Sequence, residues 1–230
     1  MTRQLTFELP VRAALGRGDY FVSEANQSAL AALENWASWP QGRMALVGPA
    51  GAGKTHLAHV WADLSGARVV PAPEILIRDP LATAAEGPLA VEDAEALAGD
   101  ASFERGLFHL CNAVTQQGQA ILITGREPPA RWKTELPDLV SRLSSFAVTR
   151  LGPPDDALLA AVLQKQFADR QVAVPENLVP FLVTHMERSF DFARYLVEEL
   201  DTRALSAGKA ITRALAIDVL GDLRDKANGD

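Results

Sequence analysis

Residues 48–55 are Gly48-Pro49-Ala50-Gly51-Ala52-Gly53-Lys54-Thr55, and they decide the fold. The segment matches G-x-x-x-x-G-K-[ST] at every fixed position, with an apolar run before it and a helical pattern after it. Its glycines let backbone amides surround phosphate groups, and the amino end of the next helix attracts the same anion. Lys54 is expected to contact the β- and γ-phosphates, and the Thr55 hydroxyl to bind Mg²⁺. The alternative is a chance Gly-rich turn.

Continuous apolar runs alternate with helical stretches on both sides of this loop. The runs cover residues 44–47, 68–70, 89–91, 120–123 and 146–148. Such runs are typical of parallel strands that helices bury on both faces, with ligands at the carboxyl ends of the strands. Only helical patterns follow Gly152-Pro153-Pro154, at 156–170, 175–186, 188–206 and 212–224. The predicted fold class is therefore α/β, a parallel sheet sandwiched by helices, plus a small all-helical domain.

This pattern divides the chain into three expected parts: an N-terminal arm (1–14), a nucleotide-binding domain (15–151) and a helical domain (152–230). The net charge of -7, without a basic tail, argues against strong autonomous DNA binding. The single cysteine, Cys111, can form no internal disulfide and indicates a buried thiol in a reducing compartment. We find neither a membrane-spanning run nor a signal peptide, so we expect a cytoplasmic protein without membrane association.

A second acidic element follows the third apolar run, in Leu89-Ala90-Val91-Glu92-Asp93. Two carboxylates at the end of a buried strand are typical of a Walker B motif. Glu92 is expected to hold Mg²⁺ through water, and Asp93 to orient or deprotonate the attacking water. The alternative is a solvated acidic turn, because Glu95 and Asp100 follow closely.

Together, these motifs resemble the AAA+ ATPases of the DnaA group, the bacterial replication initiators. The resemblance covers most of the chain and is carried by residues 19–22 with Asn26, 51–57, 92–99 and 123–129. It implies an AAA+ fold with a helical lid, and ADP or ATP with Mg²⁺ as ligands. It also implies that Thr124, on the sensor 1 strand, contacts the attacking water or the γ-phosphate. The nucleotide contacts that it implies are Tyr20, Phe21, Val22, Asn26, Gly48, Pro49, Gly51, Ala52, Gly53, Lys54, Thr55 and His56.

Two arginines acquire roles through the same resemblance. Residues 136–143 are most similar to the DnaA paralogues that inactivate the initiator, and in these Arg142 would be an arginine finger for a neighbouring subunit. The alternative for Arg142 is a surface salt bridge to Asp138. In the lid, Asp191 stands where the sensor 2 arginine belongs, so Arg194, one helical turn later, is expected to reach the nucleotide instead. Arg188, one turn earlier, is the alternative.

Residues 3–10 resemble the Gln-Leu-x-Leu-Phe peptides that dock in the replicative sliding clamp, the β subunit of DNA polymerase III. Gln4 would bind a polar subsite of the clamp, while Leu5, Phe7 and Leu9 would fill apolar pockets. The alternative is an edge strand, because these apolar residues alternate with polar ones. Glu8 departs from the final aromatic residue of the clamp-binding pattern.

The resemblance therefore implies a regulator of chromosome replication initiation that binds the clamp and promotes ATP hydrolysis by DnaA. The expected partners are DnaA and the sliding clamp, with a homo-oligomer as a further possibility, and the chain's own ATPase activity is expected to be weak. The alternative is a self-contained AAA+ ATPase or a DnaA-like loader or adaptor. A GTPase is disfavoured because the sequence has no Asn-Lys-x-Asp motif.

Overall fold

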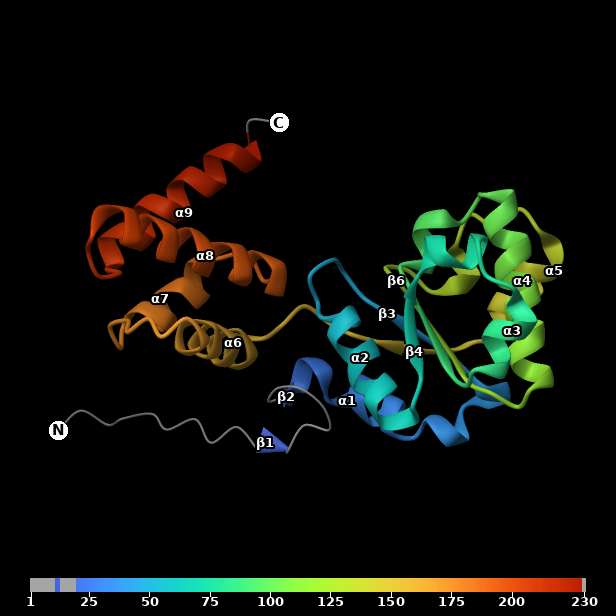
Figure 1. Cartoon of the computed structure of the whole chain (residues 1–230). Helices are drawn as coiled ribbons and strands as arrows, with labels where there is room; N and C mark the ends of the chain where they lie inside the picture. Colours follow the sequence, from blue (N-terminus) through green and yellow to red (C-terminus); the bar gives the residue numbers. More distant parts are fainter. Residues whose placement is uncertain (1–10, 13–19, 229–230) are drawn as a thin grey trace. The chain divides into compact units, whose positions relative to one another are not determined.

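The computed structural model describes residues 11–12 and 20–228 (Figure 1). The predicted clamp-binding residues Gln4, Leu5, Phe7 and Leu9 lie outside the described residues. The chain divides into two compact units. The nucleotide-binding unit contains residues 25–152, and the helical unit contains residues 21–24 and 153–228. A short two-stranded sheet joins β1 (Val11–Arg12) to β2 (Tyr20–Phe21).

The nucleotide-binding unit is built on a five-stranded sheet, in which every strand pair is parallel and the order is β4-β5-β6-β3-β7. The strands are β3 (Arg43–Val47), β4 (Arg68–Pro71), β5 (Leu89–Glu92), β6 (Ile121–Gly125) and β7 (Ala147–Arg150). The helices are α1 (Glu24–Glu34), α2 (Lys54–Ser65), α3 (Pro80–Ala85), α4 (Ala101–Gln116) and α5 (Pro137–Ser144). Short 3₁₀ helices cover Trp36–Ser38, Pro40–Gly42, Ala72–Leu76, Ala94–Leu97 and Pro129–Arg131.

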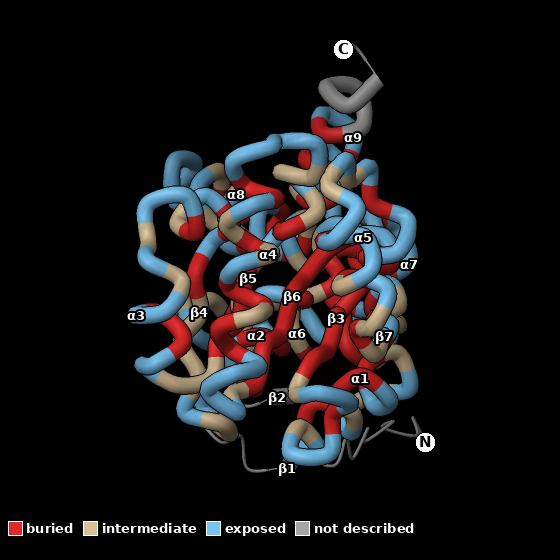
Figure 2. Tube along the Cα trace, turned by 90° about the vertical axis from the view of Figure 1, so that its right-hand side faces the viewer, coloured by how far each residue is buried: buried red, intermediate tan, exposed pale blue. Residues whose placement is uncertain are grey.

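Helices cover both faces of this sheet. Figure 1 shows α1 and α2 on one side of it and α3, α4 and α5 on the other. Strands β3 and β6 are buried at every residue, which explains their continuous apolar character, and they form the buried centre of the unit in Figure 2. The predicted α/β class with a helix-covered parallel sheet is confirmed.

Helix α4 contributes an apolar stripe to the core at a spacing of three and four residues. The stripe contains Phe103, Leu107, Leu110, Cys111 and Val114, which are all buried. The predicted burial of Cys111 is confirmed, and its burial raises the pKa of the thiol to about 12, against an opposing effect of nearby Arg43 and Arg142. Burial of each large side chain in such a core contributes about 1.5–3 kcal/mol to folding.

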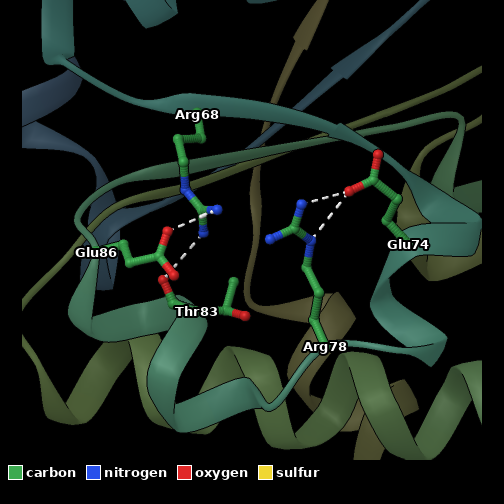
Figure 3. A network of polar contacts seen from close by, with 5 residues as sticks. All are labelled: Arg68, Glu74, Arg78, Thr83 and Glu86. Atoms are coloured by element: carbon green, nitrogen blue, oxygen red, sulfur yellow. Dashed lines mark hydrogen bonds and ion pairs between the residues drawn. The ribbon is translucent and has the colours of Figure 1, made fainter.

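The edge strand β4 is flanked by two ion pairs (Figure 3). Arg68, on the strand, places Nη1 2.7 Å from Glu86 Oε2 and donates from Nη2 to the Thr83 carbonyl over 3.4 Å. Arg78 lies 2.5 Å from Glu74 Oε2. Charged side chains along an edge strand oppose its pairing with a foreign strand.

The helical unit contains α6 (Asp156–Asp169), α7 (Leu178–His185), α8 (Phe190–Ala207) and α9 (Arg213–Asn228), around an apolar core of its own. Side-chain caps begin three of these helices: Asp155 accepts from the Leu158 amide, Ser189 from the Phe192 amide and Thr212 from the Leu215 amide. Arg203 of α8 bonds Glu199 and, over 2.7 Å, Asp222 of α9. None of the helices in the described ranges has the length and apolarity that crossing a bilayer requires.

Candidate nucleotide-binding site

The loop between β3 and α2 has a backbone that requires glycine at several positions. Gly51 and Gly53 have φ values of 67° and 94°, in the left-handed region that side chains disfavour. A Cβ atom on Gly48 would lie 2.3 Å from the Leu151 carbonyl oxygen, so no other residue fits there without a backbone shift. The loop is therefore closely packed against the segment that leaves β7.

Lys54 is the first residue of α2, and its side chain turns back into this loop. Its Nζ donates to the carbonyl oxygens of Gly48 over 2.9 Å and of Pro49 over 2.8 Å, and only 8% of the residue is exposed. An anion bound on the loop would lie beside this ammonium and the amino end of α2, both of which attract negative charge. Thr55 and His56 follow on the exposed side of the same helical turn.

Glu92 and Asp93 lie at the end of β5, and their environments differ. Within the described residues, Glu92 Oε1 is buried and accepts no hydrogen bond, which is costly for a carboxylate oxygen. Asp93 is exposed, has a φ of 52°, and donates its amide to Thr124 Oγ1 over 2.9 Å. Thr124 therefore connects the acidic strand end to β6 while its own hydroxyl proton remains available as a donor. This hydrogen bond could not be predicted from the sequence.

The strand register brings these motifs to one edge of the sheet. Leu46 of β3 lies opposite Thr124 of β6, and Val91 of β5 lies opposite Ile123. The phosphate loop, the acidic pair and Thr124 thus meet at the carboxyl ends of adjacent strands, where α/β proteins bind ligands. The part of the chain that the structure describes contains no cluster of three His, Cys, Asp or Glu side chains for a metal. The oxygen groups of this site are of the kind that magnesium prefers: Thr55, phosphate oxygens and water would hold the ion, with Glu92 Oε1 as an acceptor.

Glu95 holds the turn that follows β6, a role that the sequence did not reveal. Its Oε2 accepts hydrogen bonds from the backbone amides of Arg126 and, over 2.9 Å, Glu127. A Cβ atom on Gly125 would lie 2.9 Å from Trp132 Cζ2 and 3.0 Å from Glu95 Oε2. The turn after Thr124 is therefore fixed by a carboxylate from the neighbouring segment.

Solved structures with this architecture include those of the replication initiator DnaA. Domain III of the Thermotoga maritima DnaA superposes with a TM-score of 0.76 at 21% identity, over 93% of this chain and 98% of that chain. The AMPPCP-bound DnaA of Aquifex aeolicus gives 0.66 at 15% identity, over 81% of this chain and 65% of the other. The chain has the AAA+ fold of DnaA domain III. No family model matches the sequence.

The residues predicted to contact the adenine are distributed over both units. Asn26 of α1 is buried in the nucleotide-binding unit, whereas the half-buried Phe21 and Val22 belong to the helical unit. The side chain of Tyr20 lies outside the described residues. Although the His56 residue is exposed, desolvation and the charge of His59 lower the pKa of His56, so its imidazole is neutral at pH 7.

Arg142, the predicted arginine finger, lies on α5 and is half-buried. Its Nη2 donates to Asn112 Oδ1 of α4 over 2.5 Å. No ion pair joins Arg142 to Asp138, both of which are described, so the salt-bridge alternative is not what the structure forms. Burial, and then the charge of Arg142, lower the pKa of Arg43, and Ser145, which accepts from Arg43 Nη1, donates to the Arg142 carbonyl oxygen.

The two candidate lid arginines lie in the helical unit and form ion pairs there. Arg194 lies 3.2 Å from Asp191, the residue that stands in the expected sensor 2 position. Arg188 pairs with Asp156 at the start of α6. Both pairs are exposed, so each contributes about 1 kcal/mol or less, and either arginine can exchange its partner for a phosphate at little cost.

Proposed function

We propose that this chain is a nucleotide-binding regulator of chromosome replication initiation that resembles Hda, the DnaA paralogue that inactivates the initiator. It binds ADP or ATP with Mg²⁺, associates with the sliding clamp through Gln4, Leu5, Phe7 and Leu9, and supplies Arg142 to ATP bound by DnaA. Hydrolysis on DnaA then prevents re-initiation. The chain acts in the cytoplasm.

Nucleotide binding is supported by the phosphate loop and by the solved relatives. The loop has the backbone that phosphate contacts require, Lys54 points into it, and Glu92 Oε1 is a buried acceptor beside it. One DnaA with the same fold was solved with AMPPCP, an ATP analogue. We assign the adenine contact to Phe21, Val22 and Asn26 from the sequence resemblance.

The observation that carries the regulatory role is the position of Arg142. It is linked through Ser145 to Arg43, the first residue of β3, whereas the phosphate loop begins after Val47, the last residue of that strand. Four steps along a strand span about 13 Å, so Arg142 lies at the opposite end of the sheet from this chain's own phosphate site. A phosphate that Arg142 contacts must therefore belong to another molecule, as an arginine finger acting in trans requires.

The test is single-turnover hydrolysis of ATP bound to the cognate DnaA, with clamp loaded on DNA and the intact chain added. We expect the wild-type chain to accelerate hydrolysis and Arg142→Ala to lose about 10³-fold or more of the acceleration. Arg131→Ala, which removes an exposed arginine that pairs with Glu127, is the matched control and should behave as wild type. Equal acceleration by Arg142→Ala and wild type would refute the proposal.

Two further arms separate the clamp and nucleotide parts of the proposal. The double variant Gln4→Ala, Leu5→Ala should lose clamp binding with ADP present throughout, and retention of binding would favour the edge-strand interpretation of residues 3–10. Lys54→Ala should lose ADP binding in equilibrium titrations, and a preference for GDP over ADP would contradict the adenine assignment.

The second candidate is a self-contained AAA+ ATPase or a DnaA-like loader or adaptor. The convergence of Glu92, Asp93 and Thr124 beside the phosphate loop favours it, because these are groups that can orient and deprotonate water. Steady ATP turnover by the chain without DnaA or clamp, abolished in Asp93→Asn, would establish this alternative. No such turnover is expected under the first proposal.

A further inference from the structure

We propose that Asn112 is a positioning residue for Arg142: its side-chain amide holds the guanidinium against α4 and releases it to an anion on a docked partner. The inference rests on the proposed function and adds a control element to it. The two residues lie on adjacent helices, and their hydrogen bond of 2.5 Å is the contact that orients Arg142.

Among the described residues, the side-chain hydrogen-bond partners of Arg142 and of its neighbour Arg43 are all neutral. Across the described ranges, neither Arg142 nor Arg43 takes part in an ion pair. Arg43 is 1% exposed, and its guanidinium donates only to neutral oxygens, those of Gln41, Thr115 and Ser145. Two neighbouring cations with neutral partners create a positive site that favours an incoming anion.

The backbone that carries Arg142 is fixed separately from its side chain. Arg43 Nη1 donates to Ser145 Oγ over 2.9 Å, and Ser145 donates from Oγ over 2.6 Å and from its amide over 3.1 Å to the Arg142 carbonyl oxygen. The end of α5 is thus anchored to buried Arg43, while the Arg142 side chain is held by Asn112 alone among the described residues. Only the side chain has to move for Arg142 to change partner.

The neutral amide of Asn112 can orient the Arg142 guanidinium and still release it to an anionic partner. A guanidinium binds an anionic oxygen more strongly than a neutral amide oxygen, because the attraction between opposite charges adds to the hydrogen bond. A phosphate or carboxylate oxygen of a partner therefore displaces Asn112 Oδ1, whereas an aspartate at residue 112 would compete with it on equal terms. The neutral side chain keeps Arg142 oriented without neutralising it.

The experiment compares Asn112→Asp and Asn112→Ala in the intact chain. Asn112→Asp keeps the shape and adds one negative charge, and we expect it to reduce the acceleration of DnaA hydrolysis about tenfold. Asn112→Ala removes the hydrogen bond to Arg142. Its acceleration of DnaA hydrolysis should stay within about threefold of wild type, since the positive site of Arg142 and Arg43 remains. Gln116→Glu adds the same charge one helical turn further along α4, at an exposed side chain, and is the matched control expected to behave as wild type.

A second readout needs no partner. In protein labelled with ¹⁵N-arginine, rotation about the Nε–Cζ bond of Arg142, assigned with an Arg142→Lys sample, should be faster in Asn112→Ala and slower in Asn112→Asp than in wild type. Unchanged rotation in all three proteins would overturn the inference. So would full acceleration of DnaA hydrolysis by Asn112→Asp. If the rotation rates change as expected but the wild-type chain does not accelerate ATP hydrolysis by DnaA, then Asn112 does hold the Arg142 side chain and the proposed function is wrong.

Discussion

Replacement of Glu104 by alanine should destabilise the nucleotide-binding unit more than any surface substitution. Glu104 lies on α4, is 2% exposed, and accepts three backbone amides through its carboxylate. Gly99 donates over 2.8 Å, Glu135 over 3.1 Å and Leu136 over 2.8 Å. The carboxylate therefore joins the loop before α4 to the loop before α5.

The magnitude follows from those three bonds. A hydrogen bond to a charged group contributes about 1.5–3 kcal/mol, so three of them sum to about 4.5–9 kcal/mol. Water reaches part of the emptied site and the loops relax, so we expect Glu104→Ala to lower the free energy of unfolding by about 3–5 kcal/mol. Glu104→Gln retains one acceptor oxygen and should cost about 1–3 kcal/mol. The free energy of unfolding of an ordinary domain is about 5–15 kcal/mol, so Glu104→Ala should remove a large part of the stability of the nucleotide-binding unit.

Urea titration followed by tryptophan fluorescence isolates this unit, because all four tryptophans lie within residues 36–132. Asp63→Ala, at an exposed carboxylate of α2 in the same unit, is the matched control and should shift the unfolding free energy by about 0.5 kcal/mol or less. A loss of less than about 1 kcal/mol in Glu104→Ala would refute the reasoning, because it would mean that the three amides find other acceptors.

Three further predictions concern packing around the site. Gly48→Ala should lose ADP affinity and about 1–3 kcal/mol of stability, measured by titration and urea unfolding, because its Cβ would overlap the Leu151 carbonyl oxygen. Glu95→Ala frees two amides of the turn after β6 and should slow any nucleotide turnover, seen as a lower kcat with ADP affinity retained. Cys111 should not react with a thiol reagent at pH 8 unless urea is added, since its pKa is raised to about 12.

The sequence predicted most of the sheet because strands that are buried on both faces carry continuous apolar runs. The carboxyl ends of two strands were not predicted, because their residues do not continue the apolar runs. Strand β6 continues through Thr124 and Gly125, which are not apolar but pair in register with Leu46 and Val47. Strand β7 lies at an edge, where exposed Val148 alternates with buried Thr149, so its end at Arg150 left no apolar pattern.

The candidate site was predictable where local spacing determines the chemistry, as in the phosphate loop. Contacts between segments some 30 residues apart could not be predicted, and these fix the rest of the site. Asn112 holds Arg142, and Glu95 holds the turn after Thr124. Arg43 begins a strand, where a charged residue is usually solvated, yet it is buried beside α4 and α5. The sequence around Arg43 does not show whether its side chain is solvated or buried.

The acidic run from Glu92 to Asp100 illustrates why charge alone is ambiguous. The spacing of these acidic residues was compatible with both a magnesium site and a solvated turn. In the structure the individual carboxylates have different contacts. Glu92 has a buried oxygen at the phosphate edge, Glu95 binds backbone amides, and Asp100 caps α4 through the amides of Ser102 and Phe103. A carboxylate oxygen that the protein leaves without a donor remains available to an ion, so we propose Glu92, rather than Glu95 or Asp100, as the acidic group of a magnesium site.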